Sequence, residues 1–302
     1  NLSIMNFGVL VILMNSIMNL LPWGGPTARV IAVLDVNEQA ILRALAPGMI
    51  VSVIYMIFVA YYMGKKERKR LGIQHLTQEE LEELCASSDK DEDNLKRPQY
   101  IWINAIMTIA LVVMLVLGTL PSVVLFLIGT VLALIINYHS LKDQRERIQE
   151  NAGDAVQVVI LVLGAGILMG LFTGTGMADA LALSLTNIIP EKFGRFWGLI
   201  VALLSAPGTF FLSNDAFYFG VLPVLAEAGM KYGFTAQELG VASLLGQAFH
   251  LLSPLVAFIY LLLNLTGLDM GEWQKQSGKW AVGIFIIFIL MASVTGAVPL
   301  FK

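Results

Sequence analysis

The chain has 302 residues, of which 57% are apolar and only 14% are charged, a balance that excludes a water-soluble protein with a charged surface. Its net charge of −3 provides no basic surface for nucleic acid, and its single cysteine cannot form an internal disulfide. Several runs without charged residues reach the roughly 20 residues that a helix needs to cross a bilayer. These runs are 1–28, 44–64, 98–141, 155–178, 239–268 and 280–301. The composition therefore predicts an all-α polytopic membrane protein embedded in a lipid bilayer.

The first apolar segment, residues 4–34, is interrupted at 21–27, where two prolines and two glycines remove helical hydrogen bonds and permit unusual backbone angles. We predict a broken helix here. A second span, 43–62, ends at the basic run 64–70, which the positive-inside rule places in the cytoplasm. Residues 65–97 are polar and of mixed charge, and we expect them to form a cytoplasmic linker.

Two further spans fit between residues 98 and 141, joined by a turn at 118–121 that contains glycine and proline. We expect a cytoplasmic loop at 142–154, because basic residues follow the second of these spans. A span from residue 155 then leads outward to a stretch, 177–189, that is amphipathic enough to lie in the membrane interface.

Residues 196–212 and 216–225 are apolar, but each stretch is too short or too interrupted by proline to cross the membrane. We predict a re-entrant hairpin instead. Its tip would hold Ser213, Asn214 and Asp215, and polar groups at membrane depth are tolerated only inside protein or beside a wet cavity.

The apolar run 239–268 is broken at residues 253–254, near its middle, and a final span at 280–299 closes the chain. An offset of 231 residues places this break in register with the first one, with Asn19 over His250, and one further span follows each break. Counted from the basic loops, the first broken helix runs outward and the second inward. This is the inverted topology of many transporters.

We therefore divide the chain into the end of a first inverted repeat, a cytoplasmic linker, two connecting spans, a cytoplasmic loop and a second inverted repeat. Their bounds are 1–64, 65–97, 98–141, 142–154 and 155–302. The predicted fold is an inverted-repeat transporter with a re-entrant hairpin and broken transmembrane helices. Because the chain opens with Asn1 inside an apolar run, without the flanks of a signal peptide, we expect an N-terminally truncated piece that lacks a first hairpin.

Broken helices expose unpaired backbone groups and aim half-helix dipoles at one point, so they hold an anion and its cation without many charged side chains. The first break would supply Gly24, Gly25, Pro26 and Thr27 to such a site, unless these residues only make a kink. Arg29 follows this break. It either neutralises a carboxylate or extends toward the outer interface, and we favour the second alternative.

Asp215 is the sharpest candidate, because a carboxylate within an apolar hairpin is costly and is functional by default, as a metal ligand or a proton carrier. The plain alternative is a loop residue that reaches water. Ser213 and Asn214 offer a hydroxyl and an amide that suit a carboxylate or a hard cation, or that merely cap the loop.

The second break supplies the remaining candidates. Ser253 carries a hydroxyl that suits an oxygen ligand, and Pro254 marks the break beside it. His250 lies one turn earlier and is either a hydrogen-bonded packing residue or a proton relay. The sequence holds no zinc-type histidine cluster, phosphate-binding loop or nucleophile elbow, so we expect neither an enzyme nor a prosthetic group.

Three runs of the sequence resemble the CitMHS family of bacterial metal-citrate:proton symporters: PWGGPTAR at 22–29, GKKERKRLG at 64–72 and LSNDAFYFG at 212–220. The likeness covers essentially the whole chain. It implies the wider ion transporter superfamily, whose two inverted halves each hold a re-entrant hairpin and a broken helix. In the sodium-coupled dicarboxylate branch the hairpin tip is Ser-Asn-Thr and contacts both substrate and cation. Ser213 and Asn214 match this tip, whereas Asp215 replaces the threonine.

The resemblance implies proton-coupled symport of citrate complexed with a divalent metal ion of the Mg²⁺ or Ca²⁺ class, across the bacterial inner membrane. An added carboxylate at Asp215 suits such a cation and offers a group for proton coupling, and His250 is the second candidate for that coupling. The alternatives are a superfamily member that carries another anion, such as a sodium-coupled dicarboxylate, and a non-transporting structural or receptor subunit. The preferred metal, the proton stoichiometry and a homodimeric state stay open.

Overall fold

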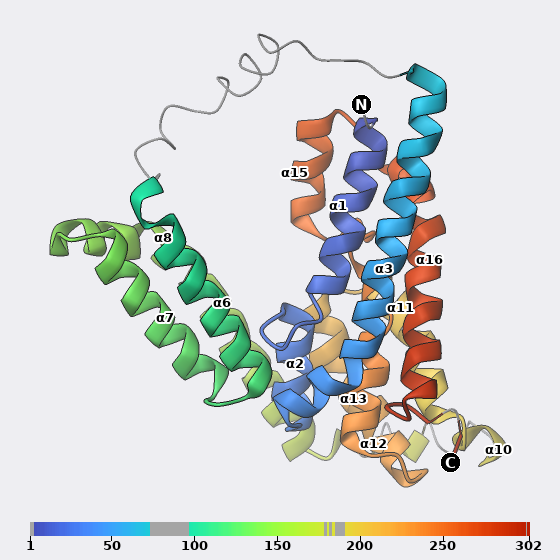
Figure 1. Cartoon of the computed structure of the whole chain (residues 1–302). Helices are drawn as coiled ribbons and strands as arrows, with labels where there is room; N and C mark the ends of the chain where they lie inside the picture. Colours follow the sequence, from blue (N-terminus) through green and yellow to red (C-terminus); the bar gives the residue numbers. More distant parts are fainter. Residues whose placement is uncertain (1–2, 73–96, 178–179, 181–182, 185–190, 300) are drawn as a thin grey trace. The chain divides into compact units, whose positions relative to one another are not determined.

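The computed structural model describes residues 3–72, 97–177, 180, 183–184, 191–299 and 301–302, and every regular element in these ranges is helical (Figure 1). The chain divides into two compact units, Asn1–Arg70 with Leu163–Lys302 and Leu71–Val162, which we describe separately. Most of the linker predicted at 65–97 and of the interfacial stretch predicted at 177–189 lies outside the described residues. Among the described helices, three are long and apolar enough to cross a membrane: Glu38–Arg70, Pro98–Leu117 and Met270–Val294.

The first unit begins with α1 (Ile4–Met18), α2 (Gly25–Leu34) and α3 (Glu38–Leu71). The gap between α1 and α2 confirms the predicted helix break. However, α3 does not stop near residue 62 but includes the whole basic run of 64–70. Arginines and lysine in a last helical turn interact favourably with the negative end of the helix dipole, which explains the longer helix.

A helical hairpin follows later in the chain, after the short α10 (Glu191–Gly194). Its arms are α11 (Trp197–Phe211) and the continuous pair η2 (Ala216–Val221) and α12 (Leu222–Lys231). The indole nitrogen of Trp197, at the start of the first arm, donates to the carbonyl of Leu225 in the second at 2.7 Å. At about 1.5 Å per residue the 15-residue α11 is shorter than the roughly 30 Å of a bilayer core, as predicted.

The second broken helix consists of α13 (Ala236–Leu244), α14 (Gln247–His250) and α15 (Ala257–Thr266). The prediction of one break at residues 253–254 was therefore too narrow, because the helix is also interrupted before α14. Gly246 lies at this extra interruption. A side chain there would collide with the α11 backbone, so the glycine allows two chain segments to approach closely.

The last helix, α16 (Met270–Val294), begins ten residues before the predicted span. The side chain of Asp269 caps it by accepting a hydrogen bond from the backbone N–H of Glu272 at 3.0 Å. An N-cap of this kind starts a helix before the apolar run begins, whereas the predicted bounds rested on the apolar run alone.

The centre of the first unit is formed by α13 and α14, since residues 239–248 are all buried. Helices α2, α11 and α12 pack against α13, and α1, α11 and α16 pack against α14. A helix that is surrounded in this way has no solvent face, which explains why its sequence is almost continuously apolar. The second broken helix is thus the element on which the hairpin and the first broken helix both rest.

The two broken helices lie antiparallel. In Figure 1, α1 runs beside α15, whereas α2 runs beside α13, and the contacts between these elements agree. Such crossed pairing arises when the first half of each broken helix lies next to the second half of the other. In addition, α2 and α15 both have 10 residues, and their starts are 232 positions apart, one more than the predicted repeat offset. An inverted repeat would produce such an arrangement, and the repeat itself stays a prediction.

The second unit holds η1 (Pro98–Tyr100), α6 (Ile101–Leu117), α7 (Ser122–Asn137) and the beginning of α8 (Leu141–Gly174). The predicted turn between the two spans is confirmed, with Gly118 in the left-handed conformation at φ 64°. Residues 142–154, predicted as a loop, are instead the first turns of α8.

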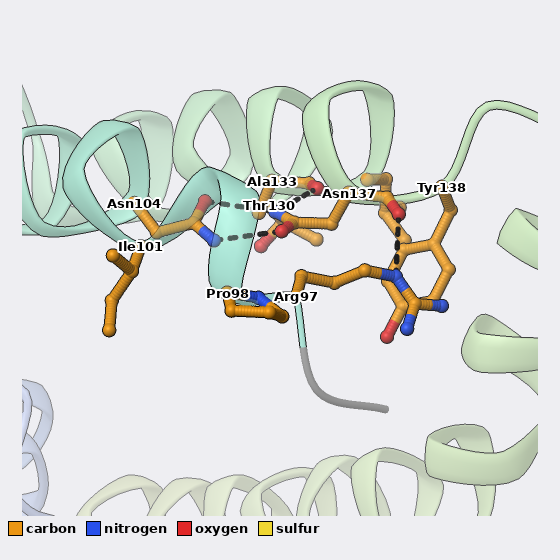
Figure 2. Close-up of a pocket in the computed structure, with 9 residues that line it drawn as sticks. Arg97, Pro98, Ile101, Asn104, Thr130, Ala133, Asn137 and Tyr138 are labelled. Carbon is orange, nitrogen blue, oxygen red and sulfur yellow. Dashed lines mark hydrogen bonds between the residues drawn. The ribbon is translucent and has the colours of Figure 1, made fainter. Parts of the chain in front are cut away.

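One reciprocal amide pair joins α6 to α7. Asn104 and Asn137 each donate a side-chain N–H to the other, at 2.8 and 2.9 Å, beside a pocket of about 700 Å³ (Figure 2). The Nε of Arg97 donates to the backbone carbonyl of Asn137 at 3.4 Å. Paired amides of this kind are a recognised way to hold two apolar helices together in lipid.

The contact between α3 and α16 yields a test of the packing. A Cβ atom on Gly283 would lie 2.6 Å from Cζ of Tyr55, whereas a Cβ on Gly278 of the same helix meets no atom within 4 Å. We expect Gly283→Val to destabilise the protein by about 1–3 kcal/mol through overpacking, and Gly278→Val to have a much smaller effect. Thermal unfolding of the purified protein in detergent measures both, and equal losses would contradict the close approach of α3 and α16.

Candidate functional site

An ion pair joins the first broken helix to the hairpin tip. Nε of Arg29, in α2, donates to Oδ1 of Asp215 at 2.8 Å, although 186 positions separate the two residues. Their side chains are 25% and 41% exposed, so the pair lies at an open edge of the packing. The prediction that Arg29 extends toward the outer interface was wrong. Opposite charges within an apolar region are much less costly together than apart, so the guanidinium turns toward the carboxylate.

The glycines of the first break give Arg29 its position. Nη1 of Arg29 donates to the carbonyl of Gly25, one turn earlier, at 2.9 Å. A Cβ on Gly25 would lie 2.9 Å from that same nitrogen, and a Cβ on Gly24 would collide with the carbonyl of Asn19. Gly24 is therefore needed for a close backbone approach, whereas the missing side chain of Gly25 leaves room for the guanidinium.

The other two residues predicted at this break have a structural role. The buried hydroxyl of Thr27 donates to the carbonyl of Leu20 at 2.9 Å, so it satisfies a backbone group that the break would otherwise leave unpaired. Pro26 is buried in the first turn of α2, where the missing N–H of proline costs least. Among the described residues, no side chain forms a cap hydrogen bond at this helix N-terminus.

The hairpin tip divides its polar groups between two tasks. The hydroxyl of Ser213 accepts a hydrogen bond from the backbone N–H of Ala216 at 3.1 Å, which is the capping role left open by the sequence. Oδ1 of Asn214 accepts from Nε2 of Gln247 at 3.3 Å. Of the three predicted tip residues, Asp215 faces the first broken helix and Asn214 the second.

Three side chains at the second break, spaced three residues apart, form hydrogen bonds to the hairpin. Nε2 of Gln247 donates to the hydroxyl of Tyr218 at 2.7 Å. Nδ1 of His250 is 2.8 Å from the carbonyl of Thr209, and the hydroxyl of Ser253 donates to the carbonyl of Phe210 at 2.6 Å. We call these three residues, Gln247, His250 and Ser253, the hairpin clamp.

Backbone geometry explains the clamp. Backbone N–H groups here donate to the carbonyl three residues earlier: Phe249 to Gly246, Leu252 to Phe249 and Ser253 to His250. Winding of this kind brings residues i and i+3 onto one face. The carbonyls that His250 and Ser253 engage belong to the last turn of α11, which has no intrahelical partners for them. The clamp therefore also completes the end of the first hairpin arm.

Besides its role in the clamp, His250 is near enough to Arg29 and Asp215 to interact weakly with both charges. A carbonyl oxygen only accepts hydrogen bonds, so the contact with Thr209 fixes the proton on Nδ1. Nε2 is then the ring nitrogen that can exchange a proton. By contrast, Pro254 is exposed, and its carbonyl accepts from the hydroxyl of Tyr260 at 2.8 Å, so Pro254 has a role in the turn.

Sequence reasoning missed Gln247 and Tyr218, which are 1% and 0% exposed. The Tyr218 hydroxyl donates to the carbonyl of Ser243 at 3.3 Å, so it must accept from Gln247, and this fixes the orientation of the amide. Oε1 of Gln247 is then a buried acceptor without a hydrogen-bond partner among the described residues. The spacing of three from His250 was the available signal, but an α-helical period places Gln247 and Ser253 on different faces.

The described residues contain no group of three or more histidine, cysteine, aspartate or glutamate side chains placed to hold a metal ion. The junction of hairpin and broken helix instead presents one carboxylate and one guanidinium in contact. It can bind one negative and one positive partner at adjacent points. A divalent cation that brings most of its own oxygen ligands needs only one or two protein carboxylates.

Comparison with known proteins identifies the family. The family model described as CitMHS, citrate transporter, matches residues 1–246. The chain is 46% identical to the citrate transporter of Bacillus subtilis (strain 168) over 284 aligned residues. This alignment covers 94% of this chain and 65% of that protein. The chain is 45% identical to the uncharacterized transporter YraO of the same organism, over 92% of this chain and 65% of that protein.

A further relative from the same organism is the Mg(2+)/citrate complex secondary transporter, with 39% identity over 94% of this chain and 65% of that protein. The chain thus spans just under two thirds of the length of the curated relatives it matches. No solved structure matches it. Because the family model covers well over half of the chain, this protein belongs to the CitMHS family of citrate transporters.

Proposed function

We propose that this chain forms part of a secondary transporter that carries citrate, complexed with a divalent metal ion of the Mg²⁺ or Ca²⁺ class, together with protons across the bacterial inner membrane. The observation that carries this proposal is the contact of Arg29 with Asp215 at the junction of a helix break and a hairpin tip. The names of two relatives, one a citrate transporter and one an Mg(2+)/citrate complex secondary transporter, support the choice of substrate.

The chemistry of the junction suits this substrate. A guanidinium pairs with a carboxylate through charge-assisted and often bidentate hydrogen bonds, so Arg29 is the group to hold a carboxylate of citrate. Asp215 offers a hard oxygen to the metal, and Mg²⁺ retains several ligands of its own while it binds one or two carboxylates. The uncapped N-terminus of α2 adds favourable partial charge on the side where the anion would lie.

The packing suggests which parts move together. The hairpin clamp fixes the hairpin to the second broken helix, whereas the ion pair is the polar contact between the hairpin tip and the first. An elevator or rocking motion would carry the clamped hairpin as one body. The groups that would carry protons are the carboxylate of Asp215 and Nε2 of His250. Two inverted repeats, 1–64 and 155–302, would then frame the site.

Two other functions are distinguished by experiment. A sodium-coupled dicarboxylate carrier would need no divalent metal for uptake, and a structural or receptor subunit would show no uptake. Against the second alternative stand two helix breaks and an ion pair between the first broken helix and the hairpin tip, because a purely structural bundle needs neither feature.

The first functional prediction concerns Asp215. In the natural full-length protein, Asp215→Asn should abolish Mg²⁺-dependent uptake of labelled citrate into proteoliposomes, because the carboxylate that receives the metal is lost. Arg29→Gln should lower uptake by about ten- to a hundredfold, the value of one charged hydrogen bond. Asp143→Asn, at the exposed start of α8, is the matched control and should leave uptake unchanged.

Uptake is measured with and without Mg²⁺, with and without a protonophore, and with a labelled dicarboxylate plus sodium. Wild-type protein that transports no metal-citrate would contradict the proposed function. Unchanged uptake by Asp215→Asn would contradict the site while leaving the function in place.

The second functional prediction concerns the hairpin clamp. Gln247→Leu removes the donor that holds both Asn214 and Tyr218, so the tip loses its defined position. We expect the KM for metal-citrate to rise severalfold with little change in the amount of protein inserted into the membrane. The control is Gln276→Leu, which removes a side chain that accepts a hydrogen bond from Nζ of Lys279 at 3.3 Å in the same helix and is not part of the hairpin clamp. The same KM for both variants would show that the clamp does not position the tip.

A further inference from the structure

We propose that Arg29 and Asp215 form an exchangeable ion pair that selects the intact metal-citrate complex over free citrate and over free metal. In the empty site each side chain is the counter-ion of the other. The complex replaces both partners at once, because its carboxylate takes the place of Asp215 at Arg29 and its metal takes the place of Arg29 at Asp215. This inference rests on the proposed function and extends it to the basis of selectivity.

The geometry permits such an exchange. Arg29 contacts Asp215 through Nε and holds the carbonyl of Gly25 through Nη1, so the guanidinium keeps one anchor when the carboxylate departs. Asp215 belongs to the hairpin tip, a different element, and can separate from α2 as that tip moves. Both side chains are partly exposed, so a ligand reaches them without dismantling the core.

Charge decides which ligand completes the exchange. Free citrate would satisfy Arg29 but would leave Asp215 without a counter-ion, next to additional negative charge. A free divalent cation would satisfy Asp215 but would leave the guanidinium facing a positive charge. Beside an apolar hairpin, a charge without a counter-ion is disfavoured relative to a pair. Only a ligand that presents both signs replaces the pair without leaving a charge unpaired.

The exchange also couples binding to movement. Nε and Oδ1 are 2.8 Å apart, and a Mg²⁺ ion alone needs oxygen contacts of about 2.1 Å on each side. A metal-citrate complex therefore cannot enter between the two side chains unless the hairpin tip moves away from α2. Ligands that replace one partner only would not drive that separation.

Binding measurements on the natural full-length protein test the exchange. Calorimetry with Mg²⁺-citrate, metal-free citrate and MgCl₂ should show wild type preferring the complex by at least a hundredfold. Asp215→Asn should bind metal-free citrate nearly as well as the complex, so that the preference falls at least tenfold. Arg29→Gln should lose citrate affinity and gain measurable affinity for Mg²⁺ alone. Arg145→Gln, on the exposed start of α8, should retain the wild-type preference.

A distance measurement covers the case in which a variant fails to fold. Spin labels on Ala28→Cys and Ala216→Cys, which are both exposed and lie on either side of the pair, report the separation of α2 from the tip in a background from which Cys85 and any other native cysteine are removed. The distance should increase with the complex but not with either component alone. An increase with citrate alone, or an Asp215→Asn variant that keeps its full preference for the complex, would overturn the exchange. Wild type that binds none of the three ligands would instead overturn the proposed function.

Discussion

The hairpin clamp is the interaction on which the site depends. Gln247, His250 and Ser253 each bond to the hairpin, and through them the buried second broken helix fixes where the hairpin tip lies. Asp215 can meet Arg29 only because that position is fixed. The same bonds satisfy the last carbonyls of α11, which lipid would leave without a partner. One set of contacts therefore closes a helix end, builds a turn and places the acidic member of an ion pair.

Much of the fold was predictable because backbone chemistry marks it locally. The prolines and glycines of the first break have few alternatives, and the structure confirms a break there. Helix ends were less predictable. The apolar runs define what is compatible with lipid, but Asp269 caps α16 well before its apolar run, and basic residues extend α3 beyond its own. Polar residues extend helices by capping them and by interacting with the helix dipole. A pattern of apolar residues contains no information about either effect.

The site was only partly predictable, for a different reason. Asp215 stands out in sequence because a carboxylate in an apolar hairpin demands an explanation. Its partner, Arg29, does not stand out, because no local sequence pattern indicates the direction in which the Arg29 side chain points. The two residues are also 186 positions apart in the sequence. Gln247 was missed because its role depends on the winding of the turn and on a tyrosine in another helix. Pairings of this kind arise from tertiary packing, and residue spacing alone does not contain them.

The tight turn around α14 determines which face of the segment carries the clamp side chains. Gln247 and Ser253 are six residues apart, and six residues of an ideal α-helix turn through about 600°, which leaves their side chains about 120° apart. Both engage the hairpin only because part of this segment winds with three residues per turn. Rewinding the turn into a regular α-helix would carry one of the two off the hairpin without any change in side-chain chemistry. The grip of the second broken helix on the hairpin is thus set by the twist of a few backbone angles.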